Sequence, residues 1–272
     1  SGLPEGITVA VGTGDDYATP LGAGMIKPGR MVCILGTAEV VGALDASPKI
    51  DPGGLVETHK YFGDTYFIEN PGWLSGGALE WFVNTFRLRG VEEMVSMAEE
   101  APAGCEGLVF LPALSGAMAP EWIESARGCF YGLTPAHGTA HMARAVLEGC
   151  ALAMRDVFGR LISMGVPIES ILLLGGGARS RLWAQIRADV SGVPVVVPER
   201  LDTSPIGAAM LAAVASKIQP DLDSCAKLID SDKTEGAGKI TLNPDPANSG
   251  VYDTVYRAYG QLFDSLRPVF GM

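Results

Sequence analysis

The sequence predicts an α/β fold, and two observations carry that prediction. Residues 171–199 contain a short apolar run, a glycine turn, a helical stretch and a second apolar run in direct succession. Strand-like and helical patterns also alternate along the rest of the chain. Of its 272 residues 47% are hydrophobic, which is enough to bury a sizeable core, either in one large α/β domain or in two small lobes.

The chain opens with a predicted strand, a helix and a hairpin. Residues 7–11 form a β-branched run that predicts a strand, and the segment after Gly12 passes from a polar turn into a helix of small residues. Two further strand-like runs, residues 31–35 and 40–44, are separated by a Gly-Thr-Ala-Glu sequence that predicts a hairpin. The backbone amides at the tip of such a hairpin can bind an anion.

A second candidate anion site follows at the start of a helix. A strand predicted near residues 66–68 leads into an amphipathic helix that begins around Ser75, Gly76 and Gly77. Phosphate binds at helix starts, where backbone N–H groups are free and the helix dipole is positive. A polar helix is expected next, at residues 91–99.

The middle of the chain predicts two strands, a long loop and a core helix. Residues 107–114 read as a buried strand, and an irregular loop of a length that often carries function separates them from a short strand near residues 129–132. Apolar residues then recur at helical spacing from Thr139 to about Met164, which predicts a long core helix.

The glycine turn at residues 175–177 is the third candidate ligand site. It follows the strand at residues 171–174, its glycines leave no Cβ in the way of a purine or a phosphate, and Ser180 can cap the next helix. Tight strand-to-helix packing would produce the same glycine pattern, so the turn alone does not distinguish a ligand site from ordinary packing. The remaining predicted elements are an alanine-rich helix at 204–217, a surface loop at 221–239 and a final amphipathic helix at 252–270.

Charge and composition exclude several classes of partner. The net charge of −11 and the isoelectric point near 4.7 argue against nucleic acid and against an anionic membrane. The five cysteines are odd in number and scattered, as is typical of reduced core residues in a cytoplasmic protein. No signal peptide or membrane span is expected. His137 and His141 are expected to cap or flank a helix rather than to bind zinc.

Together these features indicate phosphoryl transfer. Asp15 and Asp16 supply carboxylates, and the three glycine-bearing bends supply backbone donors for phosphate oxygens. A P-loop fold is disfavoured, because the segment GAGKIT at 236–241 lacks the required glycine spacing and the adjacent serine or threonine. A dinucleotide-binding oxidoreductase domain is also disfavoured, because GGGARS lacks the G-x-G-x-x-G spacing.

Several motifs in one order resemble the C-terminal domain of the FGGY carbohydrate kinases, within the actin and sugar-kinase ATPase superfamily. GTGDDYATPLGAG is similar to the family's GGGDxAAxxLGAG element, LGTAE to its second phosphate hairpin, and GGGARSRLWAQIRADVSGVPV to its adenosine motif. The resemblance implies a ribonuclease-H-like (actin-like ATPase) domain over residues 1–272, with a mixed central sheet flanked by helices. It also implies that the N-terminal sugar-binding lobe, the partner across the ATP cleft, is absent from this chain.

The resemblance assigns roles to individual residues. Asp15 corresponds to the catalytic aspartate, which is expected to deprotonate the sugar hydroxyl and to lie near Mg²⁺; a turn aspartate that caps the next helix is the alternative. Asp16 stands where relatives place a substrate-binding amide, and it either binds a substrate hydroxyl, raises the pKa of Asp15 or points to solvent. The implied ATP contacts are Gly14, Gly36, Thr37, Gly76, Gly176, Gly177, Ala178 and Arg181.

The positions of two further residues and the identity of the substrate remain to be determined from the structure. Glu80 faces either the nucleotide or solvent, and Trp183 is expected in the core. The resemblance favours a pentulose kinase such as a xylulokinase, whereas the loop sequence GAMAPEW favours glycerol or another polyol. A non-enzymatic, actin-like regulatory module that binds nucleotide is the alternative of another class. Whether the protein forms a homodimer is left open.

Overall fold

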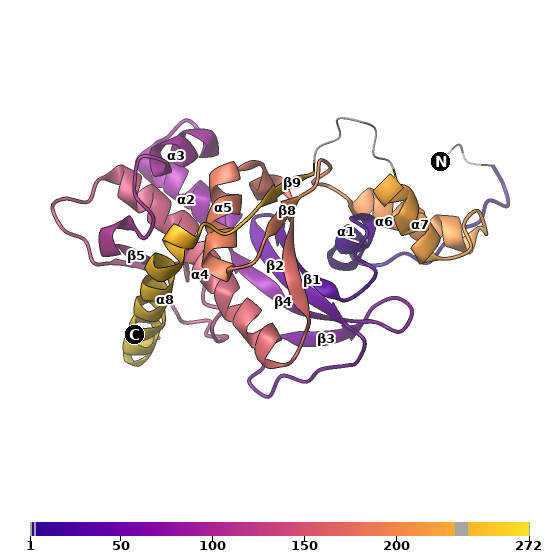
Figure 1. Cartoon of the computed structure of the whole chain (residues 1–272), viewed down its shortest axis with the longest axis horizontal. Helices are drawn as coiled ribbons and strands as arrows, with labels where there is room; N and C mark the ends of the chain where they lie inside the picture. The colour runs from indigo at the N-terminus through magenta and orange to yellow at the C-terminus, as the bar shows by residue number, and fades with distance from the viewer. Residues whose placement is uncertain (1, 3, 232–238, 272) are drawn as a thin grey trace.

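A mixed sheet of seven strands forms the centre of the part of the chain that this computed structural model describes, namely residue 2, residues 4–231 and residues 239–271 (Figure 1). In spatial order the strands are β3 (Glu57–Lys60), β4 (Tyr66–Leu74), β2 (Ala38–Asp45), β1 (Gly29–Leu35), β7 (Ile168–Leu174), β8 (Val195–Val197) and β9 (Ile240–Leu242). Strands β1, β7 and β8 are parallel, and the other neighbours pair antiparallel. The carboxyl ends of β1, β4 and β7 therefore meet at one edge of the sheet.

Helices cover both faces of the sheet. On one face lie α1 (Asp15–Gly22), α6 (Ser204–Ala215) and α7 (Leu222–Ser231), which group near the N-terminus in Figure 1. On the other side lie α2 (Gly76–Phe86), α3 (Val91–Ala98), α4 (Thr139–Ser163), α5 (Arg181–Ser191) and α8 (Pro246–Leu266). A two-stranded sheet of β5 (Val109–Leu111) and β6 (Cys129–Tyr131) and the 3₁₀ turns η1 (Cys105–Gly107), η2 (Gly176–Arg179) and η3 (Arg267–Val269) complete the described elements.

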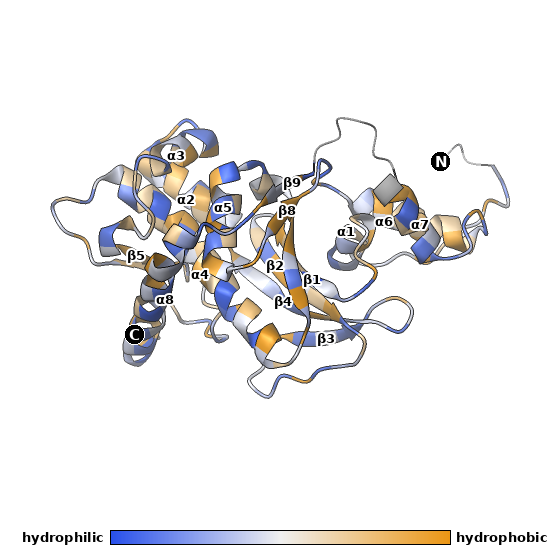
Figure 2. Cartoon of the chain, in the orientation of Figure 1, coloured by the Kyte–Doolittle hydropathy of each residue, from blue (hydrophilic) through white to orange (hydrophobic). Residues whose placement is uncertain are grey.

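Alternation along the strands creates two hydrophobic layers. Met31, Cys33 and Leu35 of β1 are buried in the layer with α2, α4 and α5, whereas Val32 is buried in the layer with α1 and α6. Side chains on a strand point alternately to its two faces, so a strand that is apolar at every position is covered on both sides. Figure 2 shows hydrophobic segments in the central strands and, mixed with hydrophilic ones, in the helices beside them.

Most of the predicted elements are confirmed. The hairpin tip is shorter than predicted, since β2 already begins at Ala38. The strand expected at 66–68 extends to Leu74, and the core helix expected from Thr139 ends at Ser163. The alanine-rich helix is α6, and Ser180 caps α5 by accepting a hydrogen bond from the Trp183 backbone N–H at 3.2 Å.

Two predictions are wrong. Residues 7–11 form no strand: within the described residues they pair with no strand of the sheet, and a strand is stable only when paired. The expected surface loop at 221–239 contains the helix α7; its residues 232–238, and with them part of the GAGKIT segment, lie outside the described residues. The final helix starts earlier than expected, because the Asp245 side chain accepts a hydrogen bond from the Ala247 N–H and caps it.

The remaining expectations concern histidine, cysteine and membrane spans. His141 Nδ1 accepts a hydrogen bond from the Gly138 N–H at 3.3 Å and so caps α4, as expected. All five cysteines are free thiols. Of the helices in the described residues, none combines the length and the apolar character that a membrane crossing requires.

Candidate active site

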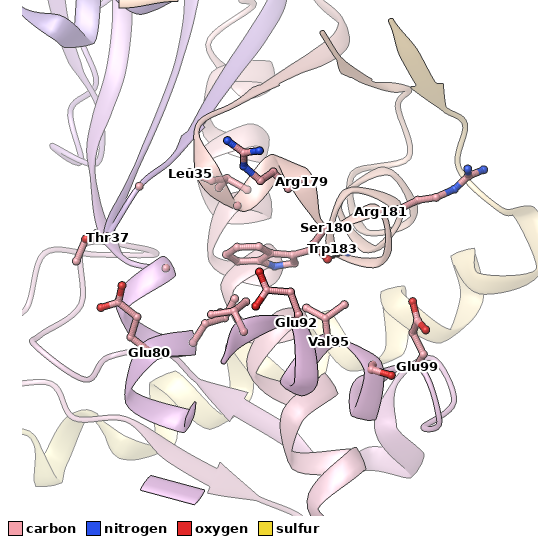
Figure 3. A pocket seen from close by; sticks show the side chains of 17 residues that line it. Leu35, Thr37, Glu80, Glu92, Val95, Glu99, Arg179, Ser180, Arg181 and Trp183 are labelled. Atoms are coloured by element: carbon pink, nitrogen blue, oxygen red, sulfur yellow. Dashed lines mark hydrogen bonds between the residues drawn. The ribbon is translucent and has the colours of Figure 1, made fainter. Parts of the chain in front are cut away.

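A cavity of about 530 Å³ opens at the edge where β1, β4 and β7 end (Figure 3). Its walls bring together three segments that are far apart in the sequence: the hairpin tip after β1, the start of α2 and the η2 turn after β7. Of the residues predicted to contact ATP, these line the cavity: Gly36, Thr37, Gly76, Gly176, Gly177 and Arg181. The three glycine-bearing bends therefore converge on one site.

The hairpin tip and the start of α2 are hydrogen-bonded to each other. The Gly76 N–H donates to the Gly36 carbonyl at 3.2 Å, and the Gly77 N–H donates to the Thr37 carbonyl at 3.0 Å. A Cβ on Gly76 would lie 2.3 Å from the Gly36 oxygen, which is well inside van der Waals contact. Glycine is required at this position because two backbones approach each other there.

The η2 turn uses its glycines in two ways. Gly175 adopts φ +81°, a left-handed conformation that glycine tolerates and most other residues do not. A Cβ on Gly177 would meet the Trp183 ring at 2.7 Å, whereas a Cβ on Gly176 would have no protein atom within 4 Å. Since Gly176 lines the cavity, its bare backbone leaves space that any side chain would occupy.

Trp183 is fully buried, as expected, and one edge of its ring still borders the cavity. Its indole N–H donates to the Leu147 carbonyl at 3.0 Å, which holds the ring in place. Figure 3 shows the ring in the middle of the site, between Arg179 and Glu92. The ring therefore supports the wall behind Gly177 without exposing a face of its own.

Charged side chains stand on opposite walls. Glu80 of α2, Glu92 of α3 and Glu99 just after α3 lie on one side, and Arg179 and Arg181 come from the η2 turn and the start of α5 (Figure 3). Glu80 lines the cavity and is exposed there. The sequence did not predict that α3 lines the cavity. Met94 and Ala98 form the buried face of this helix, and Val91 and Val95 form a second apolar pair beside it, which could have indicated a second contact surface.

Asp15, Asp16 and Gly14 do not line this cavity. Asp15 begins α1 and is exposed, and Gly14 precedes it at the N-cap position. Burial and then the charge of Asp15 raise the pKa of Asp16. Ala178 also lies away from the cavity, with its side chain packed in the core at 3% exposure.

The loop between β8 and α6, residues 198–203, connects the η2 turn to α1. The Gly175 N–H donates to the Leu201 carbonyl at 3.0 Å, and the Thr203 hydroxyl donates to the Thr19 carbonyl at 2.6 Å. Helix α1 also packs closely on α6, where a Cβ on Gly22 would lie 1.9 Å from the Thr203 carbonyl oxygen. The helix that carries Asp15 is therefore anchored to the same loop as the η2 turn.

A titratable cluster supports the first turn of α1 from the β3–β4 hairpin. The Tyr17 ring packs edge-on against His59 at 5.9 Å, and His59 Nε2 lies 3.7 Å from Glu69 Oε1. Burial and then the charge of Asp16 raise the pKa of Glu69 to about 7, although the Tyr17 hydroxyl acts in the opposite direction. Protonation in this cluster is thus coupled to the charge beside Asp15.

The chain matches one protein family along most of its length. The matching model describes the FGGY family of carbohydrate kinases, C-terminal domain, and covers residues 31–216, a range that begins after Asp15 and Asp16. A xylulose kinase of Bacillus subtilis (strain 168) is 27% identical over 265 residues, which are 97% of this chain and 52% of that protein. A glycerol kinase of Myxococcus xanthus (strain DK1622) is 33% identical over 251 residues, which are 89% of this chain and 50% of that protein.

Solved structures share the architecture. The xylulose kinase from Rhodospirillum rubrum superposes with a TM-score of 0.85 at 31% identity over 100% of this chain and 54% of that one. The chain thus spans about half the length of the relatives it matches. Its mixed sheet flanked by helices is the actin-like ATPase fold of these sugar kinases.

Proposed function

Because the chain belongs to the FGGY family of carbohydrate kinases, as a C-terminal domain, we propose that it supplies the ATP-binding lobe and the catalytic aspartate of a sugar kinase. The observation that carries the proposal is the convergence of the hairpin tip, the α2 start and the η2 turn on one cavity. No single one of these bends is specific for a nucleotide, and their assembly around one space of suitable size supports the proposal.

The cavity fits an adenine nucleotide. Gly176 and Gly177 leave a wall without side chains, and the half-buried Val91 and Val95 offer an apolar surface for the base. The hydroxyl of Thr37 is a donor for phosphate oxygens at the opposite end, whereas the Gly76 and Gly77 N–H groups are already bonded to the hairpin carbonyls.

Asp15 is the proposed proton acceptor. In the reaction, a sugar hydroxyl gives its proton to the Asp15 carboxylate while its oxygen forms a bond to the terminal phosphorus, and ADP leaves. Mg²⁺ would neutralise charge on the phosphate oxygens. The described residues contain no group of three or more His, Cys, Asp or Glu side chains able to hold a metal.

A second lobe would complete the site. Relatives are about twice as long as this chain, and most sugar contacts are expected on the part that it lacks. Ile7, Val9 and Val11 are 51%, 86% and 94% exposed although their sequence is strand-like. Such a segment is suited to pair with a sheet outside this chain. When the two lobes close, Asp15 and the cavity would both face the cleft between them.

The proposed acceptor is a pentulose such as xylulose. Xylulose kinases match 97% and 100% of the chain in sequence and in structure, respectively. A polyol is the second candidate, because the Myxococcus glycerol kinase is 33% identical over 89% of the chain. The two acceptors differ in length and in the carbonyl group, so one assay separates them.

The test uses the longer kinase of which this chain would form the C-terminal half. ADP release is measured against a panel of ketoses, aldoses and polyols, with Asp15→Asn as the matched variant. We expect turnover with a pentulose, a loss of at least 100-fold in kcat for Asp15→Asn, and nearly unchanged ADP affinity. Nucleotide binding without turnover of any acceptor would instead indicate a non-enzymatic module, and unchanged turnover in the variant would remove Asp15 from its role.

A further inference from the structure

A fully buried ion pair lies behind the cavity and makes no contact with solvent. Glu39 stands at the start of β2, two residues after Thr37, and Arg187 lies in the middle of α5. Both side chains are 0% exposed. The guanidinium holds the carboxylate with two parallel hydrogen bonds of 2.5 and 2.8 Å, the geometry that orients both partners most strictly.

The pair is connected to all three glycine-bearing bends. Glu39 belongs to the hairpin itself, and its Oε2 also accepts a hydrogen bond from the Ser75 hydroxyl at 2.8 Å, directly before Gly76. The Arg187 guanidinium lies 4.8 Å from the centre of the Trp183 ring, and that ring closes the space behind Gly177. One ion pair thus joins the hairpin tip, the start of α2 and the η2 turn.

Stability alone does not explain this arrangement. Desolvation of two charges offsets most of their attraction, and replacing a buried ion pair by well-packed neutral residues is often neutral or stabilising. Ser75 occupies the N-cap position of α2 without capping it, and the hydrogen bond of its hydroxyl goes to Glu39 of the hairpin.

The charges of the pair also suit an anionic ligand. An uncompensated carboxylate behind the hairpin would repel the phosphates of a nucleotide. Burial works against the charge of Arg187, but the Glu39 carboxylate outweighs it and raises the pKa of Arg187. Arg187 remains a cation and cancels the carboxylate.

We propose that the Glu39–Arg187 pair is a positioning device that holds the three bends at the separation required by an adenine nucleotide. The inference rests on the proposed function of the cavity. It assigns no contact with the ligand to either residue, and both act through Thr37, Gly76 and Trp183.

The test compares two double variants of buried ion pairs. Glu39→Gln with Arg187→Met removes the charges of the proposed device while keeping similar volumes. Glu148→Gln with Arg144→Met is the matched control: that pair, at 2.8 Å and with side chains 2% and 10% exposed, lies on α4 against Tyr252 of α8 and does not line the cavity. Urea unfolding and ADP titration by calorimetry are measured for each variant and for the unaltered chain.

We expect similar unfolding midpoints for the two double variants, and a Kd for ADP at least 10-fold higher for the first variant only. In the longer kinase the same variant should raise the KM for ATP and leave the KM for the sugar unchanged. Equal ADP affinity in both variants and the unaltered chain would overturn the inference. If the unaltered chain binds no ADP, the proposed function fails instead.

A second variant covers the case in which the first does not fold. Ser75→Ala keeps both charges and removes only the link to α2. It should weaken ADP binding about threefold or more, since the start of α2 is then no longer held to Glu39. Unchanged ADP affinity in Ser75→Ala would then overturn the inference.

Discussion

Substituting Gly176 by alanine should raise stability and lower nucleotide affinity at the same time. The added Cβ would meet no protein atom within 4 Å, and Gly176 has no left-handed φ, so the folded chain accepts it without strain. Restricting the unfolded chain then stabilises the protein by about 0.4–1 kcal/mol. The same methyl group occupies the cavity, where crowding a well-packed contact costs about 1–3 kcal/mol. This corresponds to roughly a 5- to 150-fold higher Kd for ADP.

Calorimetric titration with ADP and urea unfolding provide the two measurements. Gly159→Ala is the control, because Gly159 is exposed in α4 and a Cβ there also meets nothing within 4 Å. It should give a similar gain in stability with unchanged ADP affinity. If Gly176→Ala binds ADP as tightly as the unaltered chain, the ligand does not lie against the η2 turn, and the assignment of the cavity is refuted.

Two further predictions concern the hairpin contact and the cluster beside α1. Gly76→Ala should lower both stability and ADP affinity, because its Cβ would lie 2.3 Å from the Gly36 oxygen and break the 3.2 Å hydrogen bond there. We expect the free energy of unfolding, measured in urea, to fall by about 2–4 kcal/mol. An unchanged unfolding midpoint would contradict this prediction. The pKa of Glu69 is raised from 4.5 to about 7, so the folded chain holds this proton more tightly than the unfolded chain. The resulting stabilisation is complete below pH 4.5 and is lost as the pH rises through 7, a decrease of at most about 3 kcal/mol in the free energy of unfolding. Glu69→Gln should therefore gain stability relative to the unaltered chain between pH 4.5 and pH 8, whereas the exposed Glu100→Gln should not; parallel pH profiles for all three would exclude this role.

Local signals explain what the sequence could predict. The hairpin tip, the helix start at Gly76 and the turn at Gly175 each follow a buried strand, so their element types could be assigned without tertiary information. Their convergence follows from parallel strands ending at one edge of a sheet. The resemblance to a family then connected the three bends to one ligand.

Features that depend on distant contacts escaped prediction. Residues 7–11 have a strand-like sequence, but strand formation depends on a partner that no local pattern reveals. The face that α3 presents to the cavity is set by tertiary packing. Glu39 and Arg187 are 148 residues apart, and neither is marked as an ion-pair member by its neighbours in the sequence.

The order of the strands has a consequence for how the chain folds. At the centre of the sheet, Cys33 of β1 pairs with Leu173 of β7, and Thr203 bonds to Thr19 across 184 residues. Contacts of such long sequence separation require closure of large loops before they contribute energy, so folding is expected to be slow relative to that of a helical bundle. During synthesis, one edge of β1 would remain unpaired until the second half of the chain, which contains β7, has left the ribosome.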